Sequence, residues 1–243
     1  MQRWDIINFF IEKYKFKKYL EIGYYKGWSF DQVKCDMKTA VDPEPCKTPQ
    51  QEMTKFGSVI EDPEGMIFKM KSDDFFFSKG VTDARLRLAH ERNGLSYEPA
   101  KYDIIFIDGL HAWHQVSKDI ENALNNLSDG GVIVLHDCNP PQYEHTTSGI
   151  DGCWTGDTYK AAIDFRVEHP GVMFYTVNTD WGVGVIKTNQ KANKHYDWMG
   201  DEKEWNVFDK GREKILNLVD MTTFLSLERT YKAVPIKPTD HVK

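Results

Sequence analysis

Apolar residues follow two different spacings along the chain, one typical of helices and one typical of buried strands. Within residues 1–17 they recur at helical spacing, which predicts a short amphipathic helix. Continuous apolar runs bounded by turn residues then predict five buried strands, at residues 19–22, 39–41, 66–70, 103–107 and 132–135. Helix-prone segments lie between or after them, one starting near Ser29 and others at residues 84–92, 113–127 and 157–168.

The connections between the strands predict the topology of the sheet. Residues 103–135 form a strand, a helix and a strand in about 33 residues, which is typical of a parallel crossover unit. Two further strands, Met173–Val177 and Gly182–Lys187, are joined by only four residues, and so short a connection allows antiparallel strands alone. We therefore predict an α/β fold in which a seven-stranded, mostly parallel sheet has helices on both faces and ends in a C-terminal antiparallel hairpin.

Length and composition are consistent with one domain over residues 1–243. We divide it into an N-terminal helix (1–17), a core built around the sheet (18–187) and a C-terminal extension (188–243). The 31 Lys and Arg against 37 Asp and Glu leave a net charge of −6. This acidic balance argues against nucleic acid or an anionic membrane as the main partner and favours a small molecule.

The sequence also lacks the features of a membrane or secreted protein and of a cysteine-based framework. No apolar run approaches the roughly 20 residues of a membrane-spanning helix, and residues 1–11 lack the order of a secretory signal, so we expect a cytoplasmic protein. The four cysteines contain no Cys-x-x-Cys pair, which argues against a zinc knuckle or a disulfide framework. The oligomeric state stays open. Either the N-terminal helix and the tail form the interface of a homo-oligomer, or they form a lid.

Polar side chains stand at the carboxyl end of every predicted parallel strand, and two glycines follow the first strand. Ligands of open α/β sheets bind at this edge. In chain order these residues are Glu21, Gly23, Gly27, Ser29, Asp42, Ser72, Asp73, Asp108, His111, His136 and Asp137. Asp42 lies 21 residues beyond Glu21, about the interval at which a carboxylate receives the hydroxyls of a ribose. The Gly-x-x-x-Gly spacing favours a nucleoside over a pyrophosphate. A turn at the glycines and a strand stop at Asp42 are the simpler alternatives.

These residues resemble a known family, the class I S-adenosylmethionine-dependent methyltransferases. The likeness lies in residues 20–29, 41–42, 72–73 and 102–137, and most specifically in Asp108-Gly109-Leu110-His111, the Asp-Gly-x-His motif of a small-molecule (sugar and macrolide type) O-methyltransferase branch. The resemblance implies a Rossmann-like fold. It places the methionine end of the cofactor near Glu21, Gly23, Gly27 and Ser29, the ribose on Asp42, and the adenine near Ser72 and Asp73. Tyr25 stands where the family more often has a middle glycine.

The resemblance also implies how an acceptor hydroxyl is activated. A hydroxyl must lose its proton to accept a methyl group, and a general base or a divalent cation can bring this about. By resemblance, Asp108 and Asp137 are metal ligands for Mg²⁺ or another divalent cation, His111 is the base, and Asp108 also lies near the cofactor. The alternatives are cofactor contact or helix capping for Asp108, and capping or a structural hydrogen bond for His111. Further candidates are Asn139, Glu144 and Asp157 as metal ligands and Tyr143, Trp154 and Trp181 as acceptor walls.

The resulting hypothesis is an S-adenosylmethionine-dependent O-methyltransferase that acts, with divalent-metal assistance, on a hydroxyl of a small molecule. The motif favours a sugar or a glycosylated metabolite over a catechol. Two alternatives stay open: a nicotinamide-dependent oxidoreductase, and a nucleoside-binding protein without catalysis. The identity of the acceptor depends on the loop at residues 138–156 and on the tail beyond Gln190, where irregular structure is expected.

Overall fold

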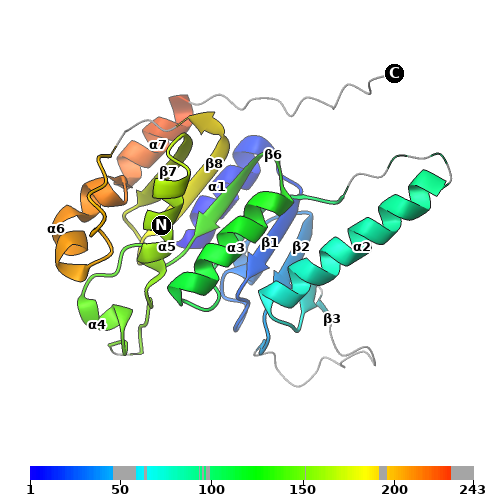
Figure 1. Ribbon diagram of the computed structural model, residues 1–243, viewed down its shortest axis with the longest axis horizontal. Coiled ribbons are helices and arrows are strands. Elements are labelled where there is room, and N and C mark those ends of the chain that lie inside the picture. The colour runs from blue at the N-terminus through cyan, green and yellow to red at the C-terminus, as the bar shows by residue number, and fades with distance from the viewer. Residues whose placement is uncertain are drawn as a thin grey trace.

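A single mixed sheet organises the protein, as the computed structural model in Figure 1 shows. The structure describes residues 1–45, 59–62, 65–92, 94, 96, 99–150, 152–191 and 196–230. Within these ranges nine strands pair in the order β3-β4-β2-β1-β5-β6-β8-β7-β9. The strands are β1 (Lys18–Ile22), β2 (Met37–Val41), β3 (Val59–Asp62), β4 (Gly65–Phe68), β5 (Tyr102–Ile107), β6 (Leu127–Leu135), β7 (Val172–Val177), β8 (Val183–Lys191) and β9 (Leu218–Val219).

The central part of the sheet confirms the predicted Rossmann-like topology. Strands β4, β2, β1, β5 and β6 are parallel neighbours, and β8 then pairs antiparallel with both β6 and β7. The predicted count of seven strands is wrong by two, because short strands extend both edges. β3 pairs antiparallel with β4, and β9 adds two residues beside β7. A strand of two residues is too short to show an alternating pattern in the sequence.

Helices cover both faces of the sheet. They are α1 (Arg3–Tyr14), α2 (Ser72–Arg92), α3 (Trp113–Asn126), α4 (Tyr143–Thr146), α5 (Thr158–Glu168), α6 (Trp205–Ile215) and α7 (Met221–Thr230). Successive strand residues point to opposite faces, so Ile105 and Ile107 of β5 pack with α3, α5 and α6, whereas Ile104 and Phe106 pack with α1 and α7. No helix of the described ranges is both long and apolar enough to cross a membrane.

The helix expected to begin near Ser29 is not formed; a single 3-10 turn at Phe30–Gln32 stands in its place. The backbone is already extended at Val33, where ψ is 127°. The buried Lys38 ammonium donates to the carbonyl oxygens of Phe30 and Val33 at 2.8 and 3.2 Å, so these carbonyls are bonded to a side chain instead of continuing a helix.

Another segment differs from the expected boundaries. Helix α2 begins at Ser72, twelve residues before the helix expected at 84–92, so Ser72 and Asp73 lie in its first turn instead of in a loop. In the tail, α6 ends at Ile215, and the chain then continues through β9 into α7. α7 packs onto the sheet through Phe224, which is fully buried.

Candidate active site

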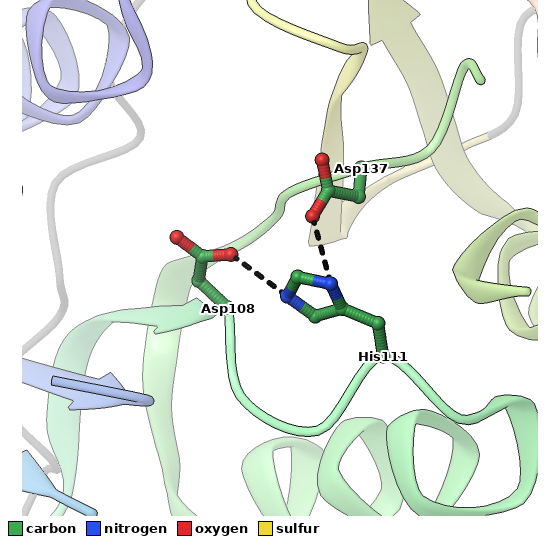
Figure 2. A group of neighbouring side chains, drawn as sticks. All are labelled: Asp108, His111 and Asp137. Carbon is green, nitrogen blue, oxygen red and sulfur yellow. Dashed lines mark ion pairs between the residues drawn. The ribbon is translucent and has the colours of Figure 1, made fainter. Parts of the chain in front are cut away.

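Asp108, His111 and Asp137 converge at the carboxyl ends of the neighbouring strands β5 and β6 (Figure 2). Backbone hydrogen bonds continue the sheet ladders into both loops, since the amide of Asp108 donates to the Ile22 carbonyl at 2.8 Å and that of His136 to Ile107 at 3.0 Å. One potential ligand atom from each of the three side chains lies within 4.8 Å of the other two. The structure therefore brings the predicted metal ligands and base into one group.

His111 lies between the two carboxylates. Its Nε2 is 3.4 Å from Asp108 Oδ1, and its Nδ1 is 3.3 Å from Asp137 Oδ2 and 2.9 Å from the Trp154 carbonyl oxygen. A carbonyl oxygen only accepts hydrogen bonds, so Nδ1 carries a proton in either charge state, and Nε2 is the atom that can take up a proton or a metal ion. Burial opposes protonation, but the hydrogen bond to Asp108 and the charge of Asp137 raise the pKa of His111.

The loop after β6 holds His111 from the other side. The Trp154 ring stacks on the imidazole, with centroids 5.3 Å apart and an interplanar angle of 29°. Gly156 allows this approach, because a Cβ at that position would lie 2.0 Å from the His111 carbonyl oxygen. Of the three predicted acceptor walls, Trp154 is the one that contacts His111. Tyr143 packs on Trp205, and Trp181 packs on His145.

His136 is a buried histidine beneath this group. Its Nδ1 lies 3.1 Å from Asp108 Oδ1 and 3.2 Å from Asp137 Oδ1, and its Nε2 lies 3.5 Å from Asp180 Oδ1. Burial disfavours the charged ring, but Asp108 and Asp137 outweigh it and raise the pKa of His136 well above its usual value. His136 therefore contacts both carboxylates and supports them from below.

Arg3, which the sequence did not indicate, enters the site from the start of α1. Its Nη1 donates to both carboxylate oxygens of Asp180, at 3.0 and 3.1 Å, and its Nε donates to Ser29 Oγ at 2.8 Å. The same Nε lies 3.5 Å from Asp108 Oδ2. Asp180 is in the turn between β7 and β8; burial would raise its pKa, but His136 and Arg3 lower it to about 2. No local pattern links these distant residues.

The carboxyl ends of β2, β1, β5 and β6 place the residues predicted for the cofactor and the metal in a row. Asp42, after β2, accepts a hydrogen bond from the Tyr25 amide at 2.8 Å and so holds the loop that follows β1. Gly23 in that loop has φ of 95°, and a Cβ there would lie 2.0 Å from the Asp108 carbonyl oxygen. The glycine is needed for the β1 and β5 loops to meet, and Tyr25 adopts the left-handed backbone expected of a glycine.

Three residues predicted for the cofactor are engaged with the protein itself. Glu21 is 1% exposed and accepts a hydrogen bond from the Tyr19 hydroxyl at 2.5 Å. Burial raises the pKa of Glu21 to about 8, so this carboxyl is largely neutral at pH 7. Ser72 and Asp73 accept hydrogen bonds from Gln115 of α3, at 3.3 and 3.2 Å. Their position at the start of α2 ties them to α3.

Two of the three additional metal ligands considered from the sequence have other partners. Asn139 Oδ1 accepts a hydrogen bond from Arg212 at 2.8 Å. Asp157 Oδ1 accepts one from the backbone amide of Trp113 at 2.6 Å, which places this carboxylate at the start of α3. Asp108, His111 and Asp137 are therefore the group among the described residues that best suits a cation at the sheet edge.

Comparison with known proteins bears on the predicted enzyme class. Residues 20–138 match the family model described as a methyltransferase domain. This segment runs from β1 to the residue after Asp137, and so includes the whole row of strand-end residues. This segment of the chain is similar to a methyltransferase domain, which agrees with the enzyme class predicted from the sequence. The family match supports the methyltransferase hypothesis over a nicotinamide-dependent oxidoreductase.

Several solved structures resemble the chain at low identity. An O-methyltransferase from Bacillus cereus in complex with SAH is 12% identical, with a TM-score of 0.46 over 76% of this chain and 79% of that one. A putative O-methyltransferase from Klebsiella pneumoniae is 14% identical, with a TM-score of 0.48 over 77% and 80%. The MycE methyltransferase of the mycinamycin biosynthetic pathway, in complex with Mg, SAH and mycinamycin VI, is 12% identical, with a TM-score of 0.44 over 80% and 51%. No curated protein matches the chain.

Proposed function

We propose that the protein transfers the methyl group of S-adenosylmethionine to a hydroxyl of a small molecule, a sugar or a glycosylated metabolite, with the help of a divalent cation such as Mg²⁺. The observation that carries this proposal is the convergence of Asp108, His111 and Asp137 beside the loop that follows β1. A methyl acceptor with a neutral hydroxyl needs both a place for its proton and a charge that favours the alkoxide.

The donor set suits a divalent cation. The carboxylates of Asp108 and Asp137 are ligands of the type that Mg²⁺, Mn²⁺ and similar ions accept, and they come from neighbouring strands. His111 Nε2 then stays free to act as the base. Burial alone would raise the pKa of Asp108, but the charge of His136 and hydrogen bonds with His111 and His136 keep it well below its usual range. Asp108 is thus an ionised oxygen ligand at any pH near neutrality.

The residues of the chain have separate roles in the proposed reaction. S-adenosylmethionine supplies an electrophilic methyl group, and a bound divalent cation lowers the pKa of an acceptor hydroxyl. In this proposal Asp42 accepts the ribose hydroxyls of the cofactor. His111 Nε2 takes the proton of the acceptor hydroxyl, and Asp108 and Asp137 stabilise the imidazolium that forms. Trp154, 43% exposed beside His111, offers a flat surface on which the apolar face of a sugar ring can stack.

The direct test is methyl transfer to a panel of sugars and glycosides, with S-adenosylhomocysteine formation as the readout. We expect turnover that EDTA abolishes and added Mg²⁺ restores, and a loss of about 100-fold or more in Asp108→Asn. Asp36→Asn is the matched control, because Asp36 is an exposed carboxylate paired with Lys17 far from the site in the fold. Full turnover in EDTA would disprove the role of the metal. Cofactor binding without transfer to any hydroxyl of the panel would disprove the proposed acceptor class.

A further inference from the structure

Helix α2 extends well beyond the sheet, as Figure 1 shows. Its first turns are anchored by Phe75 and Phe76, which are buried in the core. Its outer side carries a stripe of apolar residues at positions 77, 81, 84 and 88, a spacing of four, three and four that is typical of a coiled-coil seam. Phe77 is 74% exposed and Leu88 is 55% exposed, so this seam faces water in a single chain.

The charges of α2 are divided between its two halves. Residues 72–83 contain three Asp and one Lys, whereas residues 84–92 contain three Arg and one Glu. The half near the sheet therefore carries a net charge of −2 and the far half +2, with His neutral. A helix with this distribution is complementary to an antiparallel copy of itself, because each acidic half then lies against a basic half.

A groove lies beside the acidic half of the helix, between α2, α3 and α5. Its floor is apolar and includes Phe76, Ile120 and Phe165. Its acidic groups include Glu121, Asp164 and Glu168, which outnumber its one lysine, Lys118. A segment that is apolar on one side and basic on its flanks would fit this groove, and the far half of α2, with Leu88, Arg85 and Arg87, has that character.

We propose that α2 is the interface of a two-fold symmetric homodimer, in which the far half of each helix lies in the groove of the other copy. The symmetry axis crosses α2 between residues 82 and 83, so Phe77 packs on Leu88 of the partner subunit and Val81 packs on Ala84 of the partner subunit. Because the contact is isologous, both grooves are filled at once and the assembly closes at two copies. Each copy also removes an exposed apolar seam from water.

The oligomeric state of the full chain tests the seam. We expect a dimer by sedimentation equilibrium, and a dissociation constant raised about 100-fold by Leu88→Glu or Phe77→Glu, the scale of a central interface residue. Met199→Glu is the matched control: Met199 is 76% exposed but lies in the tail, outside α2 and the groove, so the dimer should persist. Circular dichroism shows whether each variant keeps its helices.

Charge reversal tests the antiparallel arrangement and the groove together. Arg85→Glu with Arg87→Glu, and separately Glu121→Lys with Glu168→Lys, should each weaken self-association about 10-fold or more. Mixing the two double variants should restore dimers, because each far half then meets a groove of opposite charge. A wild-type chain that stays monomeric at every concentration tested would overturn the proposal. A dimer that survives Leu88→Glu and both charge reversals would do the same, and would show that another surface forms the interface.

Discussion

The two ends of α1 both bring a cation to a carboxylate, yet they differ in what surrounds the pair. At the start of the helix, Arg3 reaches Asp180 and Asp108 at the open edge of the sheet. At its end, Lys13 Nζ donates to Glu228 Oε2 of α7 at 2.7 Å. The first pair belongs to the candidate active site. The second pair joins α1 to α7, away from that site.

Solvent access and hydrogen-bond satisfaction separate the two groups. Glu228 is fully buried and accepts hydrogen bonds from Lys187 at 2.9 Å and from Tyr175 at 2.9 Å, in addition to the one from Lys13. Asp108 keeps 16% of its side chain exposed and lies beside the likewise accessible His111. A fully paired, sealed group can only stabilise the fold, whereas partly open carboxylates can still bind a ligand.

The most direct test of this contrast replaces the proposed base, His111, by an uncharged polar side chain of similar size. We expect His111→Gln to lower kcat/KM about 100-fold or more, because general-base assistance is lost, while the thermal midpoint stays near that of the wild type. Steady-state kinetics and calorimetry on one preparation measure both quantities. Unchanged kinetics in this variant would mean that His111 is not the base.

The second test is a substitution in the buried group at the C-terminal end of α1, where we expect a loss of stability. Glu228→Ala leaves Lys187, itself only 1% exposed, buried without its carboxylate, and we expect a loss of about 3–5 kcal/mol in the free energy of unfolding. Chemical denaturation measures it. Asp36→Ala removes an exposed pair with Lys17 and should cost less than about 1 kcal/mol. A loss as small for Glu228→Ala as for this control would contradict the structural role assigned to the buried group.

Arg3 should affect both activity and stability, since it anchors α1 and also faces the candidate active site. We expect Arg3→Met to cost about 1–3 kcal/mol of stability through the lost guanidinium hydrogen bonds to Asp180 and to lower kcat/KM about 10-fold by loosening Asp108. Arg3→Lys should recover part of the stability but less of the activity, because one ammonium cannot replace the planar fork that joins Ser29 to Asp180. Equal recovery of both would assign Arg3 a purely structural role.

The smallest expected effect is the pH dependence of stability at the sealed end. Burial opposes ionisation of Glu228, but Lys187 and Lys13 outweigh it and lower its pKa below the usual 4.5. The unfolded chain therefore binds this proton first as the pH falls. The stabilisation from Glu228 is complete above about pH 4.5 and is lost at lower pH. Glu228→Gln should flatten the fall of the unfolding free energy in acid, and an unchanged acid limb would contradict this assignment.

Much of the sheet and the centre of the site could be predicted, because the signals involved are local. Apolar runs of strand length, the short connection before β8 and the strand, helix and strand of residues 103–135 determine which strands are neighbours. Consecutive parallel strands in such a unit lie side by side, so Asp108 and Asp137 had to meet at one edge. The turn after β1 was predicted with a helix from Ser29, where the structure has only a 3-10 turn at Phe30–Gln32.

Other features depend on how distant elements dock. Arg3 and Asp180 are 177 positions apart, and their contact exists only because α1 packs across the sheet toward the turn after β7. The same packing buries Glu21 beside Tyr19 and encloses Glu228 between α1, α7 and β8. The local pattern of residues thus defined the strands and the row of polar groups at their ends. Docking of the helices decided which of those groups are sealed by ion pairs and which face solvent, because burial and charge pairing are properties of the packed chain.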